Sequence, residues 1–128
     1  MGIRIEKDTI LNWINEMGKH LRLYVDKWES GLEDNEKIEL DHSGYKEFFQ
    51  VDREYFLQAD EAKLLRFVDG LQKEQVRPLG LLLMYDGLLS RESSLLQKAK
   101  FLLELNMKRS GDFSFEDYNY LATIDKHI

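Results

Sequence analysis

The chain has 128 residues, of which 43% are hydrophobic and 33% charged, with one proline and no cysteine. This composition fits one globular domain with a core of its own, and it excludes disulfides, thiolate metal sites and cysteine nucleophiles. The net charge of −6 opposes binding to nucleic-acid phosphates, so we expect no nucleic-acid partner.

The first predicted element is a long amphipathic helix over residues 9–30. Apolar residues recur along it at alternating spacings of three and four, which places them on one face: Ile10, Ile14, Met17, Leu21, Tyr24 and Trp28. Trp13 and Val25 widen this face, and Gly31 is placed to end the helix. The face either packs into the chain's own core or pairs with a second copy, and we expect the former.

Residues 31–44 are acidic and lack periodicity, which indicates a loop, and residues 45–128 are predicted to form a helical body. The body opens with two short helices joined near Gln50, followed by a third that ends at Gly70. Each of these three helices has a residue that is suited to cap its N-terminus: Ser43, Asp52 and Asp60.

The most apolar stretch is LGLLLMYDGLL, residues 79–89. As a helix it rises about 16 Å, whereas a bilayer core is about 30 Å thick, so we expect no membrane crossing. A helix that begins around residues 76–78 and is apolar on every side predicts the central helix of a bundle. Gly80 and Gly87 share one side, which indicates close approach of a neighbouring helix. Asp86 either reaches the rim and is solvated, or is buried with a partner, and we expect the rim.

Residues 76–109 are predicted to form two helices with a tight connection between them. Gly87 on the first helix, with Ala99 and Leu103 on the second, follows the small-and-large residue pattern of a tetratricopeptide repeat, and the hairpin resembles one such repeat. The resemblance implies an antiparallel helical pair. The whole chain also looks like small bacterial helical proteins of unknown function, and that resemblance implies no active-site residues.

The last predicted element is a short closing helix that follows Ser114. Ser114 and Asp117 have the spacing of a capping box, with Asp in place of Glu. Apolar residues recur at three-residue intervals, and we expect them to form one face of this helix: Phe115, Tyr118, Leu121 and Ile124.

The sequence offers little catalytic chemistry. Glycine-rich nucleotide loops and the G-x-S-x-G nucleophile motif are absent. Glu16 with His20, and Glu39 with His42, have the spacing of metal ligands. A di-iron bundle, however, needs two Glu-x-x-His motifs and two further glutamates in its core. We therefore predict no catalytic, cofactor-binding or metal-binding residues.

The sequence as a whole predicts an all-α, single-domain bundle of five to seven helices in a cytoplasmic protein. A non-enzymatic module for protein–protein interaction or self-association fits it best, with a protein, a peptide or a second copy as the partner. Because aromatic residues dominate interface hot spots, we expect the first helix to supply the interaction surface: Trp13, Met17, Leu21, Tyr24 and Trp28. The alternative is a helical bundle that binds a small ligand or a metal, with or without enzymatic activity.

Overall fold

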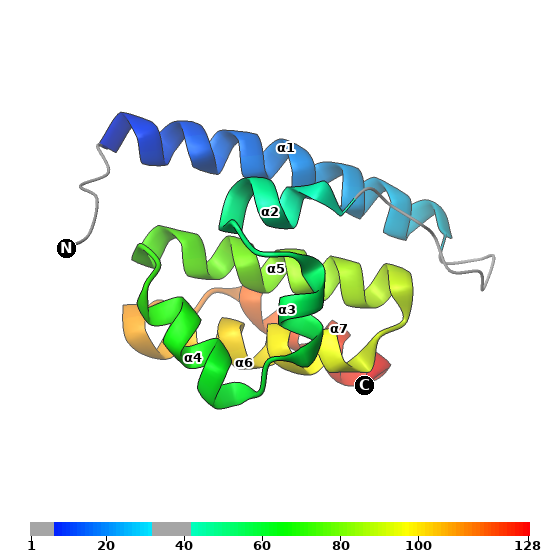
Figure 1. Cartoon of the computed structure of the whole chain (residues 1–128). Helices are drawn as coiled ribbons and strands as arrows, with labels where there is room; N and C mark the ends of the chain where they lie inside the picture. The colour runs from blue at the N-terminus through cyan, green and yellow to red at the C-terminus, as the bar shows by residue number, and fades with distance from the viewer. Residues whose placement is uncertain (1–6, 32–41) are drawn as a thin grey trace.

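Helix α5 (Lys73–Ser90) runs through the middle of the molecule, and the other helices pack around it (Figure 1). The computed structural model describes residues 7–31 and 42–128, and within these ranges the chain forms seven α-helices and no strand. This confirms the predicted all-α bundle. The other helices are α1 (Lys7–Gly31), α2 (Ser43–Phe49), α3 (Arg53–Gln58), α4 (Glu61–Asp69), α6 (Ser93–Ser110) and α7 (Phe115–His127).

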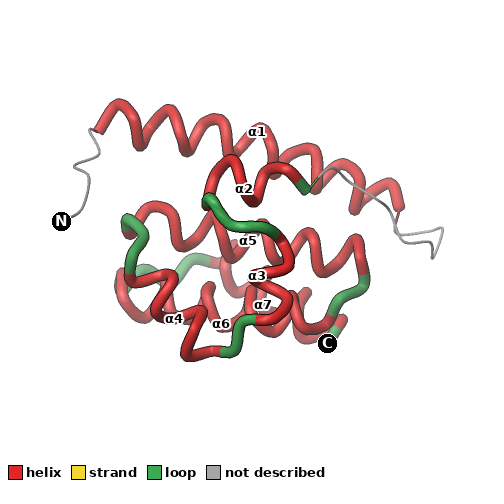
Figure 2. The backbone as a smooth tube through the Cα atoms, viewed as in Figure 1, coloured by secondary structure: helices red, strands yellow, loops and turns green. Residues whose placement is uncertain are grey.

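The helices lie in layers on either side of α5. Helix α1 covers one side, together with α2, and α6 and α7 cover the opposite side (Figure 1). Short loops join α2 to α3 and α3 to α4. Helices α3 and α4 lie beside the hairpin that α5 forms with α6 (Figure 2). No helix in the described ranges combines the length and the apolar character that a membrane crossing requires.

Helix α1 confirms the predicted helix over residues 9–30. Most of the predicted acidic loop, residues 32–41, lies outside the described residues. Its predicted end at residue 44 was wrong, because α2 already begins at Ser43, with the Tyr45 amide donating to the His42 carbonyl at 3.2 Å. Ser43 is therefore the first helical residue, and the N-cap is His42.

The cap of α4 agrees with the sequence, since the Asp60 carboxylate accepts the Lys63 amide at 2.8 Å and the helix ends at Gly70. Asp52 occupies the N-cap position of α3, but its side chain makes no capping hydrogen bond.

Helix α5 begins at Lys73, earlier than the predicted start around residues 76–78. The reason is a cap that lies before the proline: the Gln75 side chain accepts the Gln72 amide at 2.8 Å. Pro78 thus lies inside the helix, where it cannot donate the amide hydrogen bond to the carbonyl four residues earlier.

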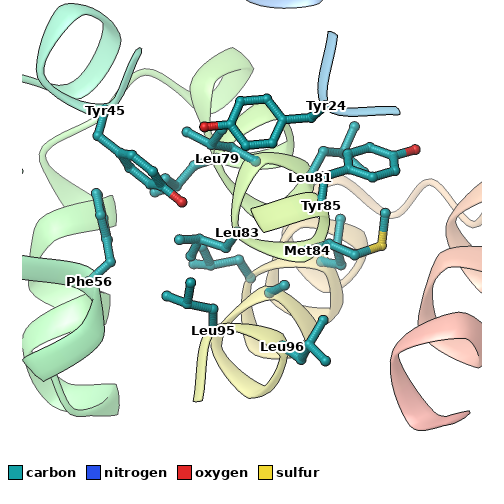
Figure 3. Close-up of a cluster of buried hydrophobic side chains, with 14 of the residues drawn as sticks. Tyr24, Tyr45, Phe56, Leu79, Leu81, Leu83, Met84, Tyr85, Leu95 and Leu96 are labelled. Carbon is teal, nitrogen blue, oxygen red and sulfur yellow. The ribbon is translucent and has the colours of Figure 1, made fainter. Parts of the chain in front are cut away.

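Every residue from 79 to 89 is buried, which confirms the prediction of a central helix. Figure 3 shows side chains from several other helices converging on it, among them Tyr24, Tyr45, Phe56, Leu95 and Leu96. The two glycines of α5 face α6, as expected. A Cβ at Gly80 would lie 3.2 Å from Leu103 Cδ2, and one at Gly87 would lie 2.8 Å from Leu96 Cγ.

The predicted apolar face of α7 was wrong in its first half. Phe115 is 90% exposed and Tyr118 52% exposed, whereas Ile124 is fully buried and Leu121 packs against the core. An interval of three residues falls short of the 3.6-residue turn by about 60°, so three such steps carry Phe115 to the side opposite Ile124. The N-cap was predicted correctly: Ser114 Oγ accepts the Asp117 amide at 3.1 Å.

Candidate functional site

Two features of the fold are candidates for function: a buried carboxylate at the centre of the bundle and a groove beside α1. The carboxylate is Asp86, which is 0% exposed, so the expectation that it reaches the rim was wrong. It is held by Tyr45 Oη, which donates to Oδ2 at 2.5 Å, and by Arg53, whose Nε and Nη2 donate to Oδ2 and Oδ1 at 2.7 and 3.0 Å. The paired geometry of a guanidinium with a carboxylate makes burial of the charge tolerable.

Two further side chains complete what we term the Asp86 cluster: Asp86, Tyr45, Arg53, His42 and Tyr24. The His42 Nδ1 atom lies 3.7 Å from Asp86 Oδ2 and 3.2 Å from the Tyr24 hydroxyl. Burial raises the pKa of Tyr45 well above its ordinary value, and the negative charge of Asp86 adds to this. Burial alone would lower the pKa of Arg53, but its hydrogen bonds to Asp86 and the charge of that carboxylate raise it.

The Asp86 cluster positions helices. Tyr45 of α2 and Arg53 of α3 bind the Asp86 carboxylate of α5 directly, whereas Tyr24 of α1 is connected to it through His42. Both carboxylate oxygens accept hydrogen bonds from the protein, and Asp86 therefore cross-links α5 to α2 and α3. Because α1 forms a wall of the groove, this cross-link also helps to define the shape of the groove.

The residues with metal-ligand spacing do not form a site in the described part of the chain. The His20 ring lies directly against Gly44 of α2, and Glu16 pairs with Lys19 at 3.4 Å. Glu39 lies outside the described residues, and His42 belongs to the Asp86 cluster. Among the described residues, no group of three or more His, Asp or Glu side chains is placed to hold a metal ion.

The second feature, which we term the α1 groove, is a hollow of about 620 Å³ between α1, α5 and α7. Its apolar surface comes from Ile14, Met17, Leu21, Val25, Pro78, Leu81, Tyr85 and Tyr120, with Gly18 between the α1 side chains. Its charged lining consists of Arg22, Asp26, Glu29 and Arg77. The groove thus combines an apolar lining with charged residues of both signs.

The sequence analysis assigned three groove-lining residues of α1, Ile14, Leu21 and Val25, to its one apolar face, whereas each of them is only partly buried. With the exposed residues Leu11 and Gly18 they form a partly exposed stripe with spacings of three and four, of which all but Leu11 line the groove. The signal was present in the periodicity, because a helix with two adjacent apolar stripes has two apolar neighbours.

The five residues predicted to face a partner all pack against their own chain. Met17 and Tyr24 are each 1% exposed, and Trp13, Leu21 and Trp28 are partly buried against the core. The Trp13 indole donates to the Phe48 carbonyl at 3.2 Å. Of the five, Met17 and Leu21 line the α1 groove.

Arg77 ties the α5 wall of the groove to α7. Its guanidinium bonds Asp117 through Nε at 2.9 Å and Glu116 through Nη2 at 2.8 Å, and it lies 5.8 Å from the centre of the Tyr120 ring. Burial alone would lower the pKa of Arg77, but its hydrogen bonds to Asp117 and Glu116 raise it. The hydrogen bond from Arg77 in turn lowers the pKa of Glu116. Sequence reasoning could not find these contacts, because the partners are about forty residues apart.

Comparison with known proteins adds no relative, since no protein-family model, no curated protein and no solved structure matches the chain. The resemblance to a tetratricopeptide repeat therefore stays a prediction, and the site is described by its own geometry.

Proposed function

We propose that the chain is a non-enzymatic interaction module that binds a helix of another polypeptide in the α1 groove. An apolar groove whose lining follows helical spacing is the kind of surface that takes up amphipathic helices. The observation that carries this proposal is the partly exposed stripe of α1, which faces Pro78, Leu81 and Tyr85 across a hollow of about 620 Å³.

The middle of the stripe is open to close approach. A Cβ placed on Gly18 would meet no atom within 4 Å, so nothing in the described residues fills the space beside this glycine. Helices that cross at small residues bring their backbones close together, which increases the contact between them. Gly18 therefore supports a helical occupant more than an extended one.

A second copy of the chain is one occupant that this proposal includes. The apolar residues of α1 are of a type that packs against the same residues of a second copy. Met17 and Leu21 belong both to the predicted interaction surface and to the groove lining. Sedimentation equilibrium over a range of protein concentrations separates self-association from the binding of a different chain.

The test uses a variant that fills the groove without disturbing the core. Gly18→Leu extends a side chain into open space and replaces the residue that costs a helix about 1 kcal/mol. The matched control is Leu23→Phe, a similar gain of bulk on the exposed outer side of α1. The probes are the chain itself and synthetic helices of about 18 residues, or five turns, with a leucine face.

We expect Gly18→Leu to lower the affinity for the occupant at least about tenfold, with an unchanged or raised melting temperature, and Leu23→Phe to bind like the native chain. Equal binding by the native chain and Gly18→Leu would show that the groove is not the docking surface. Absence of both self-association and peptide binding up to about 1 mM would overturn the proposal.

A further inference from the structure

The α1 groove ends in a pair of tyrosines flanked by carboxylates from two helices. Tyr85 on α5 and Tyr120 on α7 meet edge to face, with ring centres 6.4 Å apart. Glu116 accepts the Tyr120 hydroxyl at 3.0 Å, and Glu29 of α1 lines the groove beside Tyr85. Aromatic rings together with acidic oxygens form a surface that attracts cations.

The electrostatic balance at this end is negative. Arg22 and Arg77 both line the groove, but the cation that acts on Tyr85 is Arg77, whose charge is shared between Glu116 and Asp117. No cation among the described residues forms an ion pair with Glu29. Burial raises the pKa of Tyr85, and the hydrogen bond with Tyr120 opposes this rise. The charges of Glu116 and Glu29 raise the pKa and that of Arg77 lowers it, so two carboxylates and one cation act on this hydroxyl.

The position of Arg77 shows how a cation fits here. Its guanidinium lies 5.8 Å from the centre of the Tyr120 ring while it bonds the two carboxylates of α7. Glu29 provides a further carboxylate on the opposite wall, and it forms no ion pair with a cation of the described residues. The whole chain carries a net charge of −6, which also favours a basic partner.

We infer that the partner is a basic amphipathic helix whose apolar face fills the α1 groove and whose Lys or Arg side chain binds between Glu29 and Glu116, against Tyr85 and Tyr120. This inference rests on the proposed function, because it names the chemistry of the helix that the groove takes up. The apolar contacts supply affinity, and the cation sets the direction in which the helix lies.

The experiment compares two synthetic helices that have the same leucine face and differ only in their polar residues, Lys in one and Glu in the other. Each is titrated by calorimetry into the native chain, into Glu29→Gln and into the control Glu16→Gln. Both variants remove one exposed carboxylate of α1, but only Glu29 lines the groove. Melting temperatures establish that all three proteins are folded.

We expect the native chain to bind the Lys helix at least about tenfold more tightly than the Glu helix. Glu29→Gln is expected to lower the affinity for the Lys helix about threefold to tenfold, and Glu16→Gln to change it less than about twofold. These changes correspond to the interaction free energies of ion pairs and cation–π contacts near a protein surface.

The two ways in which the experiment can fail are distinct. If both helices bind equally and Gly18→Leu abolishes both interactions, the groove takes up helices and the inferred cation site is wrong. The same conclusion follows if Glu29→Gln and Glu16→Gln have equal effects, because a general charge effect then explains the preference. If neither helix binds up to about 1 mM, the proposed function and the inference are both overturned.

Discussion

Removal of one partner from the Arg53–Asp86 pair is expected to destabilise the fold strongly. Arg53→Met deletes two N–H donors, at 2.7 and 3.0 Å, from a carboxylate whose side chain is 1% exposed. An uncompensated buried charge costs about 3–5 kcal/mol. Because the Arg53 side chain is itself 21% exposed and Tyr45 still donates to Asp86, we expect the lower end, about 3 kcal/mol.

Asp86→Leu removes the other partner. It leaves Arg53 partly solvated and deprives the Tyr45 hydroxyl of its acceptor, so we expect a loss of about 2–3 kcal/mol. The double variant leaves no unpaired charge in the interior, and its loss is expected to be close to that of Asp86→Leu alone. The double-mutant cycle should then give a coupling free energy of about 3 kcal/mol, the whole loss caused by Arg53→Met.

Urea unfolding followed by circular dichroism measures all four free energies of unfolding. Comparable m-values among the variants are the control, since they show that each unfolds from a similarly compact state. Additive effects, with a coupling below about 0.5 kcal/mol, would refute the conclusion that the two side chains act as a pair.

Three further predictions concern single contacts. Because burial and the charge of Asp86 raise the pKa of Tyr45 above 10.0, the folded state keeps the proton that the unfolded chain loses. The free energy of unfolding should therefore fall as the pH rises above about 10, and urea titrations should show a shallower fall for Tyr45→Phe. Gly87→Ala, whose Cβ would lie 2.8 Å from a Leu96 carbon, should cost about 1–3 kcal/mol, whereas Gly18→Ala should stabilise by about 0.5–1 kcal/mol in thermal melts. Arg77→Met should speed proteolysis of α7 and cost about 1–2 kcal/mol, a value reduced because the arginine is one-third exposed.

Local rules predicted most of the helices. Apolar periodicity placed α1 to within two residues at its N-terminal end and one at its C-terminal end, and Asp60, Gly70 and Ser114 mark helix ends as their types indicate. The uniform hydrophobicity of residues 79–89 also revealed a central helix, because no other arrangement in water buries every face.

The contacts of charged groups were not predictable in the same way. Asp86 and Arg53 are 33 residues apart, and no spacing rule connects an aspartate on one helix with an arginine on another. The apolar neighbours of Asp86 were a usable signal, since a carboxylate in such a helix is rarely fully buried unless it is paired. The error for α7 had a different source, because a three-residue repeat looks periodic in the sequence but turns steadily around the helix.

The Asp86 cluster and the α1 groove are linked through α1, and the link has a measurable consequence. Helices α5 and α6 pack closely along their length, with both glycines of α5 against α6, whereas α1 is held by α5, by α2 and by Tyr24 at the edge of the cluster. Loss of the cluster should therefore loosen α1 before the α5–α6 hairpin. In native-state hydrogen exchange, Arg53→Met should lower the protection of α1 amides more than that of α6 amides. An equal fall in both helices would show that the cluster stabilises the fold as one cooperative unit and does not control the wall of the groove.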